Sequence, residues 1–253
     1  MTFLDDVNDH RSREIFQSST VGALLAGLDD GDLTIAELLR HGTFGLGTFD
    51  ALDGEMVVLD GVCYQLHPDG TVTVAAGDRT TPFAAVTDLH ADITIDLPAG
   101  HTDRAALIRL LESRLPGDNY FYAVRVDGVA ASVTTRTVRK QAKPYPSLLQ
   151  AAQGEQRRSF TDLPGTLVGF RSPDYAGTVT VPGYHLHFID DQRRRGGHVL
   201  DFAFSAGTVT VGIVRNLRLR LPSAPAFARA ELTGDQAGSA IAAAEGGSSP
   251  ATT

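Results

Sequence analysis

The sequence is nearly devoid of cysteine and lacks long hydrophobic runs, and each absence excludes a class of protein. Cys63 is the one cysteine in 253 residues, so neither an intramolecular disulfide nor an all-cysteine zinc site can form. The acidic N-terminus has no hydrophobic stretch of signal-peptide length, and no segment reaches the ~20 apolar residues that span a bilayer. We therefore expect a cytoplasmic protein with no membrane partner, in which Cys63 is a small core residue.

Continuous stretches of basic residues are also scarce. The formal net charge is −8, whereas a protein that binds a phosphate backbone needs a basic stripe. The basic cluster Arg193-Arg194-Arg195 falls in a predicted turn, where a solvated loop tip explains it better than an anion-binding patch. The charge pattern thus argues against a nucleic-acid partner.

Length and composition are those of a globular protein. With 42% hydrophobic and 21% charged residues, 253 residues can form one large or two modest domains. Residues 140–146 include Pro144 and Pro146, which prevent a regular helix or central strand and so indicate a boundary. We predict an N-terminal β-meander and helix unit (residues 1–139). A C-terminal β unit (residues 140–253) should follow, ending in a helix and a disordered tail.

Hydrophobic periodicity predicts an α+β fold with two β-rich units and peripheral helices. We expect the first unit to be a mixed sheet and the second a smaller barrel-like β unit. We expect helices at residues 16–28, 34–41, 102–115, 147–153 and 236–245. Thr34 and Glu37 form a capping box at the start of the second helix. Alternating segments separated by Asp-Gly turns, among them Asp60-Gly61 and Asp127-Gly128, predict strands. These are residues 44–49, 56–59, 62–66, 71–75, 83–87, 93–97, 120–126, 130–138, 165–170, 178–181, 184–188, 198–205, 208–211 and 217–221.

Three histidines near residue 190 are the strongest functional signal. His185 and His187 are two residues apart in a predicted strand, so their side chains share a face about 7 Å apart. A polar turn at residues 190–197 ends in two glycines, and a hairpin there would bring His198 beside the pair. Three imidazoles on one wall can bind a divalent metal and leave positions open for chemistry. Zinc fits best, although imidazole also suits iron, nickel and copper.

The histidine pattern alone leaves other interpretations open. The hairpin could be solvated, or its histidines could be core-edge residues satisfied by backbone hydrogen bonds. A cupin-type oxygenase or isomerase can also use two alternate histidines, but that family places a glutamate shortly afterwards, where this chain has Asp190 and Asp191. A sensor or metal-storage module that binds small ligands without turnover is the non-enzymatic alternative.

Several long segments make the chain similar to the bacterial α-acetolactate decarboxylases. The similarity extends from Phe16 to Glu245, and so many long runs in one order are highly specific. The matching runs are Gln17-Ser18-Ser19-Thr20, Thr34-Ile35-Ala36-Glu37-Leu38-Leu39-Arg40-His41-Gly42, Phe44-Gly45-Leu46-Gly47-Thr48-Phe49, Leu52-Asp53-Gly54-Glu55, Thr135-Arg136-Thr137-Val138, Lys143-Pro144-Tyr145-Pro146, Gly165-Thr166-Leu167-Val168-Gly169-Phe170-Arg171-Ser172-Pro173 and the histidine hairpin.

The resemblance implies a metal-dependent carboxy-lyase that converts (S)-2-acetolactate to (R)-acetoin and CO2, a step of acetoin and butanediol formation. It implies that His185, His187 and His198 bind Zn2+ in the second β-rich unit. Arg136 matches the family's active-site arginine, Glu55 its active-site glutamate and Thr48 a substrate-pocket threonine; a second catalytic glutamate falls on Glu245. Independently of the resemblance, exposed edges of the predicted meander favour a homodimer.

The chemistry of the reaction suits these residue types. Loss of CO2 leaves an enolate-like anion, which a metal stabilises, while a guanidinium holds the departing carboxylate through two hydrogen bonds. Arg136 is the candidate for that role; without the resemblance it would be interpreted as a surface arginine paired with Asp127 or a neighbour. Glu55 is the preferred proton donor, directly or through metal-bound water, with Glu245 as its partner or as a group approaching the metal.

Overall fold

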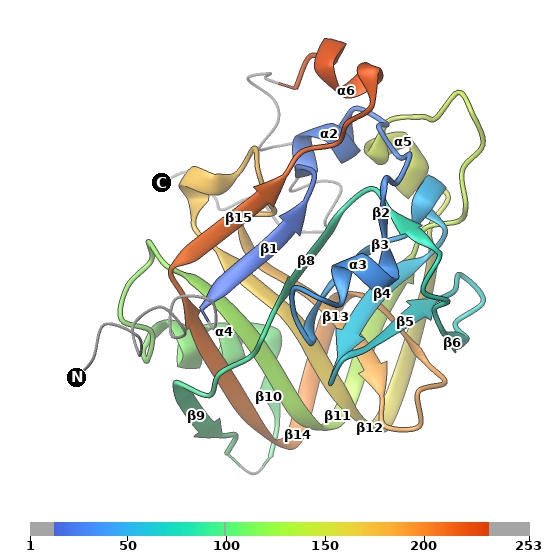
Figure 1. Ribbon diagram of the computed structural model, residues 1–253. Helices are drawn as coiled ribbons and strands as arrows, with labels where there is room; N and C mark the ends of the chain where they lie inside the picture. Colours follow the sequence, from blue (N-terminus) through green and yellow to red (C-terminus); the bar gives the residue numbers. More distant parts are fainter. Residues whose placement is uncertain (1–12, 99, 233–253) are drawn as a thin grey trace, which may run out of the picture.

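The computed structural model describes residues 13–98 and 100–232 (Figure 1). The helix predicted at residues 236–245, the tail that follows it and Glu245 lie outside the described residues. Among the helices of the described part, none has the length and apolar character needed to cross a membrane.

Two sheets form the body of the molecule (Figure 1). The first has seven strands in the order β15-β1-β8-β3-β4-β5-β6 and is mixed, because β1 and β15 run parallel and the other neighbours antiparallel. Its strands are β1 Glu14–Ser18, β3 Phe44–Thr48, β4 Glu55–Leu59, β5 Val62–Leu66, β6 Val72–Val74, β8 Ala84–Thr87 and β15 Asn216–Arg220.

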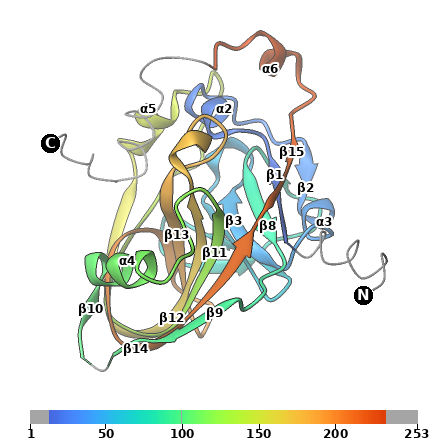
Figure 2. The same ribbon diagram turned by 90° about the vertical axis from the view of Figure 1, so that its left-hand side faces the viewer.

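The second sheet has six strands and curls into a barrel (Figure 2). Strand β13 pairs with both β12 and β14, so β14, β11, β12 and β13 close a ring of hydrogen-bonded strands. This confirms the predicted α+β class with its barrel-like unit. The strands are β9 Ile93–Asp96, β10 Thr102–Asp103, β11 Phe121–Thr137, β12 Gln156–Ser172, β13 Gly183–Asp190 and β14 Gly196–Val214.

Short helices lie around the sheets, and local sequence explains how they begin. Thr34 and Glu37 form the predicted capping box of α3, and Asp103 caps α4, whose Leu107 and Leu111 pack into the barrel core. The helices are α2 Val21–Leu25, α3 Ile35–Leu38, α4 Arg104–Glu112, α5 Leu148–Ala152 and α6 Pro225–Arg229, with 3₁₀ turns η1 Asp50–Leu52 and η2 Asp174–Ala176 and a small sheet of β2 Leu33–Thr34 and β7 Thr80–Thr81.

Strand alternation in β13 separates two of the hydrophobic core clusters. In β13, Leu186 and Phe188 pack inside the barrel, whereas Ile189 belongs to a cluster between the two sheets. That second cluster joins Leu46 and Val57 of the seven-stranded sheet to the barrel. The residues of β13 that alternate with Leu186 and Phe188 therefore face the space between the sheets.

Several predicted elements differ from the structure. Residues 16–28 are not one helix: residues 16–18 belong to β1, which pairs with distant β15, and Thr20 caps the short α2. Residues 178–181 form no strand. The strands predicted at residues 120–126 and 130–138 are one continuous β11, and those at 198–205 and 208–211 are one β14.

The predicted boundary between residues 1–139 and 140–253 falls in the segment between β11 and α5. Both large sheets contain strands from each side of that position, since β11 pairs with β12 and β14, and β1 pairs with β15. The division into two units stays a prediction. Cys63 is buried in the core, as predicted, and burial raises the pKa of its thiol to about 12.

A buried carboxylate shapes the turn between β13 and β14. Asp190 is 2% exposed, and its Oδ1 accepts hydrogen bonds from the backbone N–H groups of Arg194 (2.6 Å) and Arg195 (2.9 Å). The backbone N–H of Asp190 donates to the carbonyl of Arg195, which closes the loop. Asp190 thus stabilises the turn that sets the register of the two histidine-bearing strands.

Replacing this carboxylate should loosen the turn. We expect Asp190→Ala to lower the free energy of unfolding by about 2–3 kcal/mol, because two backbone donors lose a charged acceptor. The adjacent Asp191, whose side chain is exposed, supplies the control: Asp191→Ala should change stability by less than about 0.5 kcal/mol. Urea unfolding of both variants measures the difference; equal stabilities would contradict this role for Asp190.

Candidate metal centre

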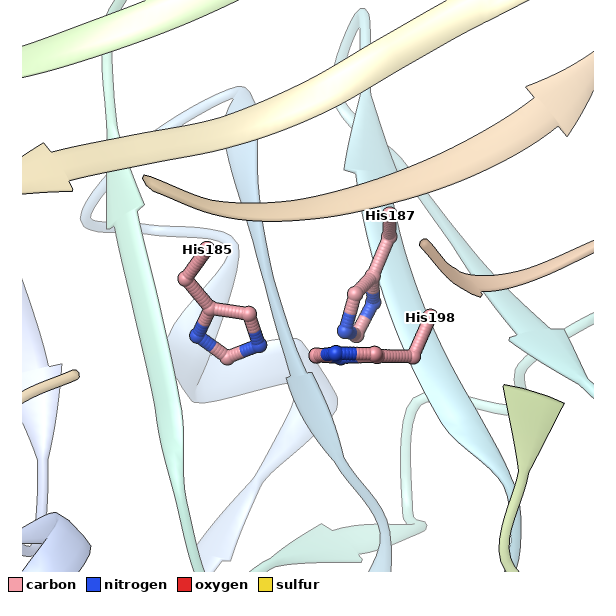
Figure 3. A group of neighbouring side chains, drawn as sticks. All are labelled: His185, His187 and His198. Carbon is pink, nitrogen blue, oxygen red and sulfur yellow. The ribbon is translucent and has the colours of Figure 1, made fainter. Parts of the chain in front are cut away.

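The three histidines converge as the sequence predicts (Figure 3). His185 and His187 lie on β13, and His198 on β14 stands opposite His187 in the antiparallel register. Their ring centroids are 5.1–5.2 Å apart, and one nitrogen from each lies within 4.8 Å of the other two. Among the described residues, these three form the one group of histidine, cysteine or acidic side chains that lie close enough together to hold a metal ion.

A backbone carbonyl from the other sheet orients His187. Its Nδ1 lies 2.8 Å from the carbonyl oxygen of Met56 on β4. Because a carbonyl can only accept, Nδ1 carries the proton and Nε2 keeps a lone pair. His187 is 1% exposed, and its Nε2 has no hydrogen-bond partner among the described residues. A buried imidazole with one nitrogen fixed by a carbonyl and the other unsatisfied fits a metal ligand.

Burial keeps the imidazoles of β13 uncharged. Burial first, and the positive charge of Arg136 second, lower the pKa of His185 to about 3. The pKa of His187 also lies well below its usual value of 6.5, chiefly because of burial and then because of neighbouring His185. A neutral imidazole is the form that binds metal, so both residues are ready to coordinate at neutral pH.

Glu55 at the start of β4 approaches this group from the opposite sheet. Its Oε2 lies 3.6 Å from Nε2 of His187, and its side chain is 13% exposed. A carboxylate oxygen and an imidazole lone pair are both acceptors, so their apposition favours a cation beside them. Together with the unsatisfied Nε2, this arrangement fits a divalent metal held by the three histidines.

Thr48 stands next to Glu55 across the β3–β4 pair. It is 6% exposed, and its hydroxyl donates to the carbonyl of Gly54 at 2.8 Å. With the hydroxyl proton committed, the oxygen lone pairs of Thr48 can only accept a hydrogen bond from a molecule in the adjoining pocket. The predicted pocket threonine therefore lies beside the predicted glutamate, as a hydrogen-bond acceptor.

Arg136 is a buried residue, and the alternative interpretation of it as a surface arginine paired with Asp127 is wrong. The side chain is 7% exposed, and Nη1 forms a salt bridge with Oε2 of Glu155 at 3.0 Å. Asp127 pairs instead with Arg125. Arg136 stands opposite His198 in the β11–β14 register, which explains why its charge reaches the histidines.

One pocket is lined by Thr48, Glu55, Arg136, His185 and His198, whereas His187 is not among its lining residues. The empty volume of the pocket, including open solvent at its entrance, is about 510 Å3. Its polar side chains come from strands β3, β4, β11, β13 and β14, and its apolar side chains come from α2, α5, η1 and the loops. The lining residues are Val21, Leu24, Gly47, Thr48, Leu52, Glu55, Phe83, Arg136, Val138, Leu148, Ala152, Val181, His185 and His198.

Two parts of this site could not be predicted from the sequence. Glu155 precedes β12 and pairs with Arg136, but an isolated glutamate after a short helix carries no pattern that marks it. The apolar wall comes from residues up to 160 positions apart, such as Val21 and Val181, which only the fold brings together. The histidines, Glu55, Thr48 and Arg136 are brought together as expected, whereas Glu245 lies outside the described residues.

Known proteins of one family resemble this chain over most of its length. The profile of the family described as alpha-acetolactate decarboxylase matches residues 15–234. An alpha-acetolactate decarboxylase of Methanosarcina mazei is 44% identical over 90% of this chain and 78% of its own length. One from Bacillus subtilis is 43% identical over 88% of each chain.

Solved structures show the same fold. The crystal structure of alpha-acetolactate decarboxylase from Bacillus subtilis superposes with a TM-score of 0.90 at 40% identity, covering 93% of this chain and all of the other. Sequence and fold thus agree over nearly the whole chain, and the chain belongs to the alpha-acetolactate decarboxylase family.

Proposed function

We propose that this protein decarboxylates (S)-2-acetolactate to (R)-acetoin and CO2, using Zn2+ bound by His185, His187 and His198. The observation that carries the proposal is the pocket itself. Two of the three clustered imidazoles, those of His185 and His198, line one cavity with a buried guanidinium and a carboxylate, in a member of the decarboxylase family. The family also favours the decarboxylase over the cupin-type and non-enzymatic alternatives.

The histidine set suits the proposed metal. Three neutral nitrogen ligands with room left for a substrate are typical of catalytic zinc sites, and imidazole is a ligand that zinc favours. When bound, the ion supplies a Lewis acid for the ketone and hydroxyl oxygens of acetolactate. The protein's own contribution is to hold His185 and His187 neutral and to fix His187 through Met56.

Arg136 is suited to the substrate carboxylate. Its guanidinium lines the pocket and stands opposite His198, so a small molecule near the histidines lies within its reach. A guanidinium binds a carboxylate through two parallel N–H···O bonds, which fixes the plane of the group that leaves. Holding that carboxylate out of the plane of the ketone aligns the breaking C–C bond with the carbonyl π system. Thr48 can meanwhile accept a hydrogen bond from the substrate hydroxyl.

Glu55 is placed to deliver the proton that completes the reaction. When the C–C bond breaks, its electron pair moves to the former ketone and leaves an enediolate, while CO2 departs. One proton must then reach one face of the new carbon to give a single enantiomer. Arg136 stays charged at ordinary pH and is a poor donor, whereas a protonated Glu55 can donate. We keep Glu245 as a second catalytic carboxylate, partner to Glu55 or approaching the metal.

The proposal extends to the setting of the enzyme. We infer a cytoplasmic protein that works as a homodimer. The seven-stranded sheet ends in β15 on one side and β6 on the other, and Leu217 and Val74 on these strands are exposed. Sheet edges that expose apolar residues favour association with a second chain, which supports the dimer.

Metal removal gives the first test of the function. We expect about one zinc per chain, and loss of CO2 release on chelation with recovery on adding Zn2+. His198→Ala should lower turnover by more than about 100-fold, since even the loss of a ligand's outer partner costs 10- to 100-fold. His67→Ala is the control, because His67 bonds to Thr73 away from this pocket. Full activity in the chelated protein would refute the metal role.

Glu55→Gln tests the proton donor. The amide keeps the shape of the side chain but cannot supply a carboxylic proton, so we expect turnover to fall by about 10²- to 10⁴-fold. Acetoin that still forms should lose enantiomeric purity, because solvent would protonate the enediolate from either face. Chiral chromatography of the product measures this. Glu37→Gln, at the exposed capping glutamate of α3, should behave as wild type; pure (R)-acetoin at full rate from Glu55→Gln would contradict the assignment.

The depressed histidine pKa values predict how the metal-free protein responds to acid. Unfolded His187 takes up a proton below pH 6.5, but the folded residue does not, so its contribution to stability falls as pH drops below 6.5. The slope is about 1.4 kcal/mol per pH unit for such a residue. His187→Gln should remove it.

Urea titrations of both proteins between pH 4 and 7 give the difference in slope. The pKa of buried Asp29, raised to about 7 by burial and neighbouring Asp30, produces an opposite slope over this range. That slope is common to both proteins and cancels when they are compared. Parallel stability curves for wild type and His187→Gln would show that His187 is protonated in the fold.

A further inference from the structure

Both carboxylate oxygens of Glu155 accept hydrogen bonds from arginines. Its Oε2 accepts from Nη1 of Arg136 at 3.0 Å, and its Oε1 accepts from Nε of Arg157 at 2.6 Å. The Glu155 side chain is 11% exposed and the Arg136 side chain 7%, whereas that of Arg157 is 69% exposed. The bond to Arg136 is therefore the buried one, and it is little screened by solvent.

Strand register explains why a carboxylate is needed here. Arg136 on β11 stands directly opposite Arg157 on β12. Like charges directly opposite on neighbouring strands destabilise the pair and push the two side chains apart. Glu155 binds both guanidinium groups and offsets their repulsion. Without Glu155, the buried cation Arg136 would lack this carboxylate, next to two histidines whose pKa values its charge already lowers.

A backbone hydrogen bond connects Glu155 to α5, a helix whose residues line the pocket. The N–H of Glu155 donates to the carbonyl of Ala152 at 3.1 Å, at the end of α5. Ala152 and Leu148 of the same helix line the pocket, as does Arg136. Helix, carboxylate and guanidinium are thus joined, and the position of Arg136 depends on the packing of α5.

We propose that Glu155 is a positioning residue, which orients the guanidinium of Arg136 toward the carboxylate of the bound substrate. This inference rests on the proposed function, in which Arg136 binds that carboxylate. Glu155 touches Arg136 and Arg157 and does not line the pocket, so it acts through Arg136. Its loss should weaken carboxylate recognition selectively and leave recognition of the diol-like part of the substrate intact.

The test compares two unreactive ligands on zinc-loaded protein by calorimetry. One is 2-hydroxy-2-methylbutanoate, which has the carboxylate and hydroxyl but no ketone; the other is 2,3-butanediol, which lacks the carboxylate. Glu155→Gln should raise the Kd of the hydroxy acid at least about tenfold, as expected for disturbing a hydrogen bond to a charged group. The Kd of the diol should change by less than about twofold. For acetolactate turnover, KM should rise more than kcat falls.

Two further variants complete the experiment. Asp127→Asn removes the carboxylate partner of Arg125 on the same strand β11, outside the pocket, and should alter neither ligand's affinity. Glu155→Asp keeps the charge on a shorter side chain and should recover part of the affinity for the hydroxy acid. If Glu155→Gln does not fold, Glu155→Asp replaces it, with the same selective but smaller loss.

The results separate this inference from the proposed function. Wild-type affinity for the hydroxy acid in both Glu155 variants, or an equal loss of both ligands, would overturn the positioning role. Wild-type protein that binds the hydroxy acid no more tightly than the diol would overturn it as well. If wild type prefers the hydroxy acid but releases no CO2 from acetolactate, the proposed function fails, and the selective loss in Glu155→Gln still supports the positioning role.

Discussion

The pairing of β13 with β14, fixed against β4 by one hydrogen bond, is the constraint on which the site depends. His187 and His198 lie directly opposite each other in the strand register, so His198 comes to lie beside His185 and His187. Nδ1 of His187 then bonds to the carbonyl of Met56 in the other sheet. A slip of one residue would turn the histidines into the barrel core, because side chains alternate along a strand. The buried turn carboxylate of Asp190 opposes such a slip.

Placing the site between two sheets also decides its electrostatics. Burial keeps His185 and His187 neutral, and the charge of Arg136 reinforces this, which suits metal binding. That same cation would repel a metal dication unless an anion stood beside it, and the buried carboxylate of Glu155 is that anion. The pocket therefore places a guanidinium beside histidines that could hold a metal ion, as the proposed function requires.

Sequence predicted the elements that local rules decide. The capping box at Thr34 and the Asp60-Gly61 turn, whose residues both have positive φ, are local features and were found correctly. Asp127-Gly128 is the same dipeptide, but it lies within strand β11 and forms no turn. There Gly128 lies opposite Gly165 and Gly207, and a Cβ at Gly128 would lie 2.2 Å from the carbonyl oxygen of Ala206. The glycines allow close approach between long curved strands, which no local pattern reveals.

The same distinction between local and distant contacts governs the site. His185, His187 and His198 lie within one hairpin, so spacing and turn chemistry sufficed to predict that they meet. The acceptor of His187 comes from 131 residues away, and it is a backbone carbonyl that any residue could supply. Glu155 is close in sequence to Arg157, but its role follows from the register that sets Arg136 opposite Arg157. Metal ligands can thus be predicted from side-chain identity, whereas the groups that orient them depend on how distant strands align.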